Sequence, residues 1–257
     1  MGQASTGAND QRSVQVEDLR LAAPFVGWSQ PALERLAAAS SQKWHEPGEV
    51  LERAWEPPTG LWIVKEGCVE LSRTSPSGRR HLVDLLAPPQ VAGLIPLLDG
   101  REALFDAVVR VRSRLVWCPC KAVTDELEAD AAAALGTIRA LCFRQRMEHD
   151  RVAMSAFDPL IARVCKTILY LGRRPGMLEG GERALPVPVT YEDLADFLDQ
   201  SPSAIVRVIR TLIKAGAVEK HYRGVVIADV GRLAAIAQNP NPINSIARDY
   251  LAKGDRI

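Results

Sequence analysis

Residues 189–220 read VTYEDLADFLDQSPSAIVRVIRTLIKAGAVEK, which predicts two short helices joined by a tight turn. Thr190 suits the N-cap of the first helix, because Asp193 follows three residues later in a near capping box. Ser201 can cap the second helix, and Pro202 suits its first position, where a backbone N–H has no partner within the helix. The second helix carries its apolar residues on one face. The stretch therefore predicts a helix-turn-helix unit.

A small hairpin is predicted directly after this unit, around Arg223 and Gly224. That order is typical of a winged helix-turn-helix, whose second helix can enter the major groove of DNA. Between residues 201 and 223, five basic residues outnumber the single acidic Glu219, whereas the whole chain has a net charge of +1. Positive charge is thus concentrated where contact with phosphates would require it. The residues predicted to contact DNA are Thr190, Ser201, Ser203, Ala204, Arg207, Arg210, Lys220 and Arg223.

The composition is that of a folded protein without a membrane anchor. The chain has 257 residues, enough for about two domains, and 47% of them are hydrophobic, too many for a mainly disordered chain. It contains no run of 18 apolar residues, and residues 1–15 lack the apolar core of a secretory signal. Five scattered cysteines, an odd number, argue against a disulfide scaffold. We therefore expect a cytoplasmic protein that does not contact membranes.

Between residues 44 and 120, short apolar and β-branched runs alternate with turn signals such as Pro47-Gly48 and Pro88-Pro89. Turn signals at this spacing predict an antiparallel barrel or roll and argue against a parallel α/β sheet.

Residues 122–156 contain no proline and a single glycine, which predicts one long helix that Asp158-Pro159 ends or kinks. Apolar residues recur along it in alternating steps of four and three, the pattern of a coiled-coil seam. Such a narrow stripe predicts a symmetric dimer, with intramolecular packing as the alternative. The predicted seam residues are Leu127, Ala134, Ile138 and Leu141.

These observations predict an α+β chain with an antiparallel, jelly-roll-like β-roll, a long dimerisation helix and a C-terminal winged helix-turn-helix. The predicted divisions are a flexible N-terminal arm (1–20), a β-roll sensor domain (21–121), a dimerisation helix (122–157), a DNA-binding domain (158–230) and a C-terminal extension (231–257).

This layout, from about residue 25 to residue 230, resembles the Crp–Fnr family of bacterial transcription regulators. The resemblance implies a sensor roll of cyclic-nucleotide-binding fold in a homodimer that binds operator DNA. It also implies RNA polymerase as a further partner and no enzymatic activity. The matching segments are PGEVL (47–51), LWIVKEGCVEL (61–71), SGRR (77–80), VTYEDLA (189–195) and the second helix (201–212).

Two parts of the chain depart from the family pattern. Pro202 and Ser203 stand where a typical member has Arg or Val and then Glu, although Arg207 fits the arginine that reads guanine. Cyclic-nucleotide binders of this fold present Gly-Glu to the ribose and Arg-Ser/Thr to the phosphate. At the matching places this chain has Ala92-Gly93-Leu94 and Phe105-Asp106. The phosphate would therefore lack its basic partner, and we expect no cyclic-AMP binding. The candidate effector pocket consists of Gly93, Leu94, Phe105, Asp106, Glu148 and His149.

The histidines and cysteines bear on four other sensing or catalytic chemistries. An iron–sulfur cluster of the Fnr kind needs an N-terminal cysteine cluster, but the first cysteine is Cys68. Haem bound by histidines such as His45 or His81, or redox sensing by Cys118 and Cys120, remains as an alternative for a regulator of this fold. A cupin-like metalloenzyme would need converging histidines and a carboxylate, and the HxH spacing is missing. We therefore predict no metal site and no resident cofactor, with haem as the alternative.

Overall fold

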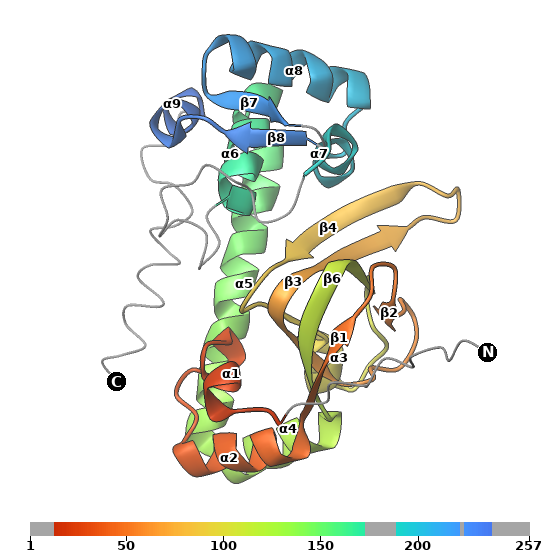
Figure 1. The fold of residues 1–257 in the computed structure, drawn as a ribbon, viewed down its shortest axis with the longest axis vertical. Helices are drawn as coiled ribbons and strands as arrows, with labels where there is room; N and C mark the ends of the chain where they lie inside the picture. The colour runs from red at the N-terminus through yellow and green to blue at the C-terminus, as the bar shows by residue number, and fades with distance from the viewer. Residues whose placement is uncertain (1–12, 173–188, 222–223, 238–257) are drawn as a thin grey trace, which may run out of the picture.

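The structure is a computed structural model that describes residues 13–172, 189–221 and 224–237. A long helix, α5 (Ala131–Phe157), runs along the molecule, with an antiparallel β-roll beside it and a helical domain at one end (Figure 1). The predicted fold class is confirmed. Within the described ranges, no helix is both long enough and apolar enough to cross a membrane.

The roll is built from strands β1 (Ser41–His45), β2 (Val50–Glu52), β3 (Leu61–Thr74), β4 (Arg80–Leu86), β5 (Val91–Ala92) and β6 (Asp106–Cys118). The strand order is β1-β6-β3-β4, while β2 pairs with β6 and β5 with β3, all antiparallel. Register shifts between β3 and β6 bend these long strands so that the sheet curls. One shift lies beside Gly67, whose φ is +89° and where a Cβ would stand 2.2 Å from the Ser113 hydroxyl.

Short helices pack at the base of the roll. They are α1 (Val16–Arg20), the 3₁₀ helix η1 (Ala23–Phe25), α2 (Gln30–Ala39) and α4 (Cys120–Ala129), while α3 (Leu94–Asp99) follows β5. The apolar core between these short helices and the roll is here called the basal core. The prediction of a flexible arm over 1–20 is wrong for residues 16–20, because they form a helix and Leu19 is fully buried in the basal core. Residues 1–12 lie outside the described residues.

The helix predicted over 122–157 is two helices, which corrects the sequence interpretation. Asp130 has an extended backbone between them, and its carboxylate accepts hydrogen bonds from the backbone N–H groups of Ala132 and Ala133 at the start of α5. A short acidic side chain competes in this way with the helical hydrogen bonds. Leu127 consequently lies on α4, where it packs against the basal core.

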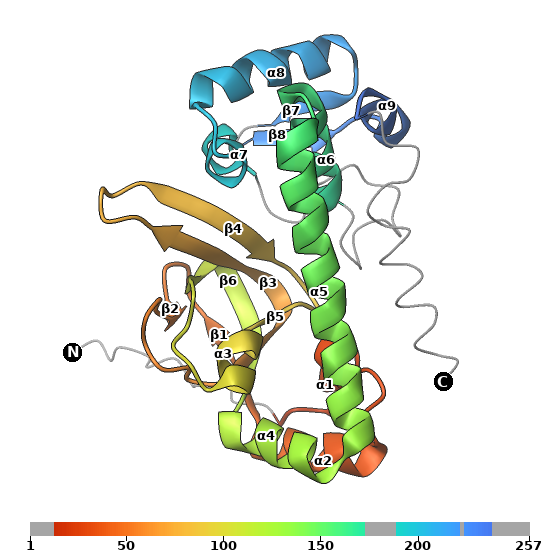
Figure 2. The same ribbon diagram turned by 180° about the vertical axis from the view of Figure 1, so that it is seen from behind.

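The two faces of α5 differ. Ala133, Gly136, Thr137 and Ala140 are buried against the N-terminal segment, where the Thr137 hydroxyl donates to the Pro24 carbonyl at 2.8 Å. Among the predicted seam residues on α5, Ala134 and Leu141 are half-buried by their own chain, and Ile138 is exposed. In Figure 2 the helix lies in front of the molecule along its length.

The C-terminal domain begins at the break that Asp158-Pro159 was predicted to make. It contains α6 (Leu160–Gly172), α7 (Tyr191–Leu198), α8 (Pro202–Lys214), the hairpin strands β7 (Val218–His221) and β8 (Gly224–Ile227), and α9 (Val230–Ile236). Leu233 of α9 is buried in the core of this domain, so the domain extends past the predicted boundary at 230. Residues 238–257 of the predicted extension lie outside the described residues.

Candidate DNA-binding surface and effector pocket

The two helices of the turn are capped as their sequences predict. The Thr190 hydroxyl accepts the backbone N–H of Asp193 at 3.0 Å, and the Asp193 carboxylate accepts the backbone N–H of Thr190 at 2.9 Å. The Ser201 hydroxyl accepts the backbone N–H of Ala204 at 3.3 Å. Between the helices, Asp199 has a φ of +57°, a left-handed conformation that aspartate tolerates. Local side chains therefore fix the angle at which α8 leaves α7.

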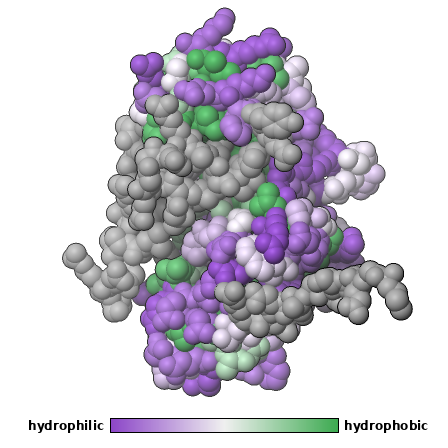
Figure 3. Space-filling view, in the orientation of Figure 1, coloured by the Kyte–Doolittle hydropathy of each residue, from purple (hydrophilic) through white to green (hydrophobic). Residues whose placement is uncertain are grey.

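One face of α8 is buried and the other faces solvent. Ile205, Ile209 and Leu212 are buried in the domain core, whereas Arg207 and Arg210 are exposed. In the space-filling view, hydrophilic side chains gather over this end of the molecule (Figure 3). A helix of this width fits the major groove of DNA, and its exposed face would meet the base edges.

Most of the residues predicted to contact DNA lie on this surface. Ser201, Ser203, Arg207 and Arg210 are exposed on or before α8, Ala204 is half-buried beside them, and Lys220 is exposed on β7 of the wing. Thr190 is half-buried at the start of α7. Arg223 lies outside the described residues.

The roll contains a small cavity at the place where the effector pocket was predicted. Its volume is about 40 Å³, and its lining includes Gly93, Leu94 and Phe105 of the predicted pocket. Asp106 instead turns its carboxylate to the backbone N–H of Ala54, at 3.0 Å. The contribution of α5 also differs from the prediction, because it comes from Arg144.

The other two predicted pocket residues are on the outer part of α5. Glu148 is exposed and pairs with Arg151, and His149 is exposed and forms a hydrogen bond with Gln145 at 2.8 Å. Neither side chain lines the cavity.

Two families match the chain, one over each half. The cyclic nucleotide-binding domain family matches residues 42–130, which hold most of the roll. The Crp-like helix-turn-helix domain family matches residues 162–236, which hold α6 to α9. This chain belongs to the Crp–Fnr family of transcription regulators.

Known relatives and solved structures agree with this assignment. A CRP-like cAMP-activated global transcriptional regulator of Mycobacterium tuberculosis is 25% identical over 183 residues, which cover 71% of this chain and 82% of the relative. The nitrogen fixation regulation protein FixK of Bradyrhizobium diazoefficiens is 25% identical over 192 residues, covering 74% of this chain and 79% of FixK. The solved structure of FixK2 from Bradyrhizobium japonicum has the same fold, with a TM-score of 0.68 at 19% identity over 77% of this chain and 96% of that chain.

Within this family fold, Glu52 is an unexpected member of the pocket. It is only 6% exposed, and its Oε1 has no hydrogen-bond partner among the described residues. The burial raises the pKa of its carboxyl from 4.5 to about 7. Gly93 beside it has a φ of +84°, and a Cβ there would collide with the Gly60 carbonyl oxygen and stand 2.7 Å from Oε1, so a glycine is required. In the sequence, Glu52 is marked only weakly, as a charged residue directly after the apolar pair Val50-Leu51.

The raised pKa of Glu52 predicts a pH-dependent stability. Since the folded state holds this proton up to about pH 7 and the unfolded state releases it near 4.5, the free energy of unfolding should fall as the pH rises between these values. The loss should be up to about 3 kcal/mol. Glu52→Gln cannot ionise, so it should gain stability relative to wild type between pH 5 and pH 8 in urea unfolding. The same pH dependence in both proteins would contradict the assignment.

The histidines and cysteines considered for sensing lie in different surroundings. His45 is buried, with its Nδ1 2.8 Å from a carboxylate oxygen of Glu49, while His81 is exposed on β4. Burial raises the pKa of the Cys118 thiol to about 12, so it stays protonated and unreactive at neutral pH. Cys118 ends β6, whereas Cys120 begins α4. The described ranges contain no group of three or more His, Cys, Asp or Glu side chains that could hold a metal ion.

Proposed function

We propose that this chain is a cytoplasmic, homodimeric, sequence-specific DNA-binding regulator that acts by binding and not by catalysis. The observation that carries the proposal is α8, which buries its apolar face in a capped helix-turn-helix and presents Arg207 and Arg210 to solvent. The exposed face of α8, which would read the base edges and is here called the reading face, is basic, as contact with DNA requires. RNA polymerase is the further partner that the family resemblance implies.

The outer face of α5 supports the homodimer. A stripe of residues on it, here called the outer stripe, repeats in alternating steps of three and four, and every member is exposed: Leu135, Ile138, Cys142, Gln145, His149 and Val152. This is the spacing of a coiled-coil seam. Three of its large apolar side chains are 46%, 53% and 67% exposed, those of Leu135, Ile138 and Val152. A second copy of the helix would cover them and place two α8 helices for successive turns of the groove.

The effector pocket does not suit a cyclic nucleotide. A cyclic phosphate needs a basic partner, but Phe105 stands at the family's clamp position and the neighbouring Asp106 is acidic. The basic residue in the lining is Arg144 of α5, and its guanidinium donates to the Val91 carbonyl at 3.4 Å. Glu52 adds a second carboxyl to this region of the roll. The cavity of about 40 Å³ is also far smaller than pockets for drug-sized ligands, roughly 300–1,000 Å³. We therefore propose DNA binding that depends on neither a cyclic nucleotide nor a resident cofactor such as haem.

Selection of duplexes from a random DNA library, with no nucleotide added, tests this function. The wild-type protein should enrich an inverted repeat whose half-sites lie about one helical turn apart. Its affinity for that duplex should not change when millimolar cyclic AMP or cyclic GMP is added, and calorimetry should show no specific heat with either nucleotide. Failure to enrich any sequence would refute the DNA-binding function. Saturable, sub-millimolar nucleotide binding would refute the interpretation of the pocket.

A further inference from the structure

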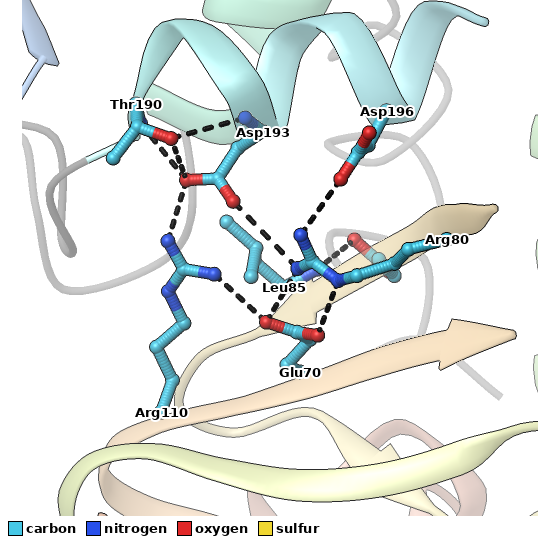
Figure 4. Close-up of polar contacts among 8 residues, drawn as sticks. Glu70, Arg80, Leu85, Arg110, Thr190, Asp193 and Asp196 are labelled. Carbon is cyan, nitrogen blue, oxygen red and sulfur yellow. Dashed lines mark hydrogen bonds and ion pairs between the residues drawn. The ribbon is translucent and has the colours of Figure 1, made fainter. Parts of the chain in front are cut away.

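A cluster of charged side chains joins the roll to the first helix of the helix-turn-helix (Figure 4). We call it the docking cluster; its members are Glu70 of β3, Arg80 of β4, Arg110 of β6, and Asp193 and Asp196 of α7. Arg110 donates to Glu70 at 2.8 Å and to Asp193 at 2.5 Å. Arg80 donates to Asp196 at 2.7 Å and lies 2.7 Å from a carboxylate oxygen of Glu70. Both arginines therefore bridge the two domains.

The centre of the docking cluster is withdrawn from water. Asp193 is 2% exposed, and the Arg110 and Glu70 side chains are 19% and 14% exposed. Burial alone would raise the pKa of Glu70, but hydrogen bonds from Arg80 and Arg110 outweigh it and hold that pKa below 4.5. Buried charges of this kind are tolerated only in a well-defined geometry, so they favour one arrangement of the two domains.

Apolar packing and a third element surround the charges. Leu82 and Leu85 of β4 belong to the same buried apolar cluster as the core of the DNA-binding domain, including Phe197 of α7. Arg151 of α5 donates to the Val83 carbonyl of β4 at 2.9 Å, and its guanidinium lies 5.4 Å from the centre of the Phe197 ring. The roll, α5 and α7 thus meet at one place, and the orientation of α7 is fixed relative to both.

This docked arrangement suits DNA binding in two ways. First, α8 lies at the end of the molecule, on the far side of its domain from the roll (Figure 1), and Arg207 and Arg210 are exposed. Second, the arginines of the roll lie beside acidic groups that would otherwise repel phosphates. Asp196 pairs with Arg80, and Asp199, next to the start of α8, pairs with Arg79.

We propose that the docking cluster is an orientation lock, which holds the helix-turn-helix in its DNA-competent position without a ligand in the roll. The proposal rests on the proposed function of α8 in reading DNA. The apparent affinity for DNA rises with the fraction of molecules in the competent orientation, so a weakened lock lowers affinity without touching the reading face. The opposite role, an autoinhibitory contact, predicts that a weakened lock raises affinity.

The principal variant is Arg110→Gln, and its matched control is Arg112→Gln. Arg112 is on the same strand and pairs with Glu46 on the exposed surface of the roll, so its loss removes the same charge away from the interface. Asp193 is left intact because it also caps α7.

Without DNA, hydrogen exchange over 80–86 and 191–198 should be several-fold faster in Arg110→Gln than in wild type, and unchanged in Arg112→Gln. Equal exchange in both variants and wild type would overturn the lock, whether or not the protein binds DNA.

The effect on DNA is measured by anisotropy with the duplex that the wild-type protein selects. Arg110→Gln should weaken binding roughly tenfold, and Arg112→Gln less than about twofold. Unchanged or tighter binding by Arg110→Gln overturns the proposal.

The part-exposed pair Arg80 and Asp196 gives a second test with less risk to folding. If Arg80 and Asp196 act on DNA affinity through their mutual ion pair, the double variant Arg80→Gln/Asp196→Asn should bind DNA no more weakly than the weaker-binding single variant. Losses of binding free energy that simply add in the double variant would contradict this. If wild-type protein selects no duplex, the proposed function fails, and exchange alone decides on the lock.

Discussion

Arg207→Ala is expected to remove most of the preference for the operator while leaving non-specific DNA binding largely in place. Arg207 is exposed on the second turn of α8, on the face opposite Ile209 and Leu212, which are buried. Its guanidinium can donate two parallel hydrogen bonds to O6 and N7 of a guanine, and such a pair contributes about 1–3 kcal/mol of discrimination in each half-site. Anisotropy titrations against operator and scrambled duplexes, at several salt concentrations, measure both affinities.

The matched control is Lys220→Ala in the wing. Lys220 is exposed on β7, where a lysine would meet phosphates and no base edges. Its loss should weaken all sequences alike and lower the slope of log affinity against log salt by about one. Arg223→Ala is expected to behave in the same way. If Arg207→Ala instead lowers both affinities by one factor, Arg207 is a phosphate contact and another residue reads the operator.

The sequence was most informative where local rules decide the structure. Capping by Thr190 and Ser201, the proline at position 202 and the apolar face of α8 each depend on residues a few positions apart. The predicted helices and turn are therefore confirmed. The same local reasoning failed at Asp130, because a regular apolar spacing continues across a residue that caps a new helix. The exposed stripe of α5 shares Ile138 with the predicted seam, but it continues through Leu135 and Cys142 instead of Ala134 and Leu141.

The remaining features depend on residues that are distant in sequence. Arg110 and Asp193 are 83 positions apart, and neither has a local pattern that marks it as a partner of the other. Glu52 enters the pocket because it ends β2 beside β5 and the start of α3, an arrangement that depends on strand pairing and register shifts. Arg144 lines the same cavity because α5 passes beside this part of the roll. Only the folded sheet brings these groups together, so the docking cluster and the pocket could not be predicted from spacing.

The outer stripe leads to the second large effect, on the oligomeric state. Ile138→Glu should convert a dimer to a monomer, because the symmetric seam would bury the new carboxylate twice, once from each copy. An unpaired buried charge costs several kcal/mol, and a total of about 4 kcal/mol raises the dimer dissociation constant roughly 1,000-fold. Leu135→Glu, on the same stripe, should act alike. Sedimentation velocity over a range of protein concentrations measures the change.

Val50→Glu is the control for Ile138→Glu, because Val50 is an apolar residue, 42% exposed, on β2, which lies on the side of the roll opposite α5 (Figure 1). It should remain a dimer. Since Ile138 is exposed in the single chain, its replacement should leave the thermal unfolding of the monomer unchanged. A monomer would keep one reading helix and lose the second half-site, whose binding is intramolecular in the dimer. Operator affinity should therefore fall far more than the loss of one arginine would cause. A dimer that survives both stripe substitutions would show that the two chains associate through another surface, and the spacing of the recognition helices would then have to be set elsewhere.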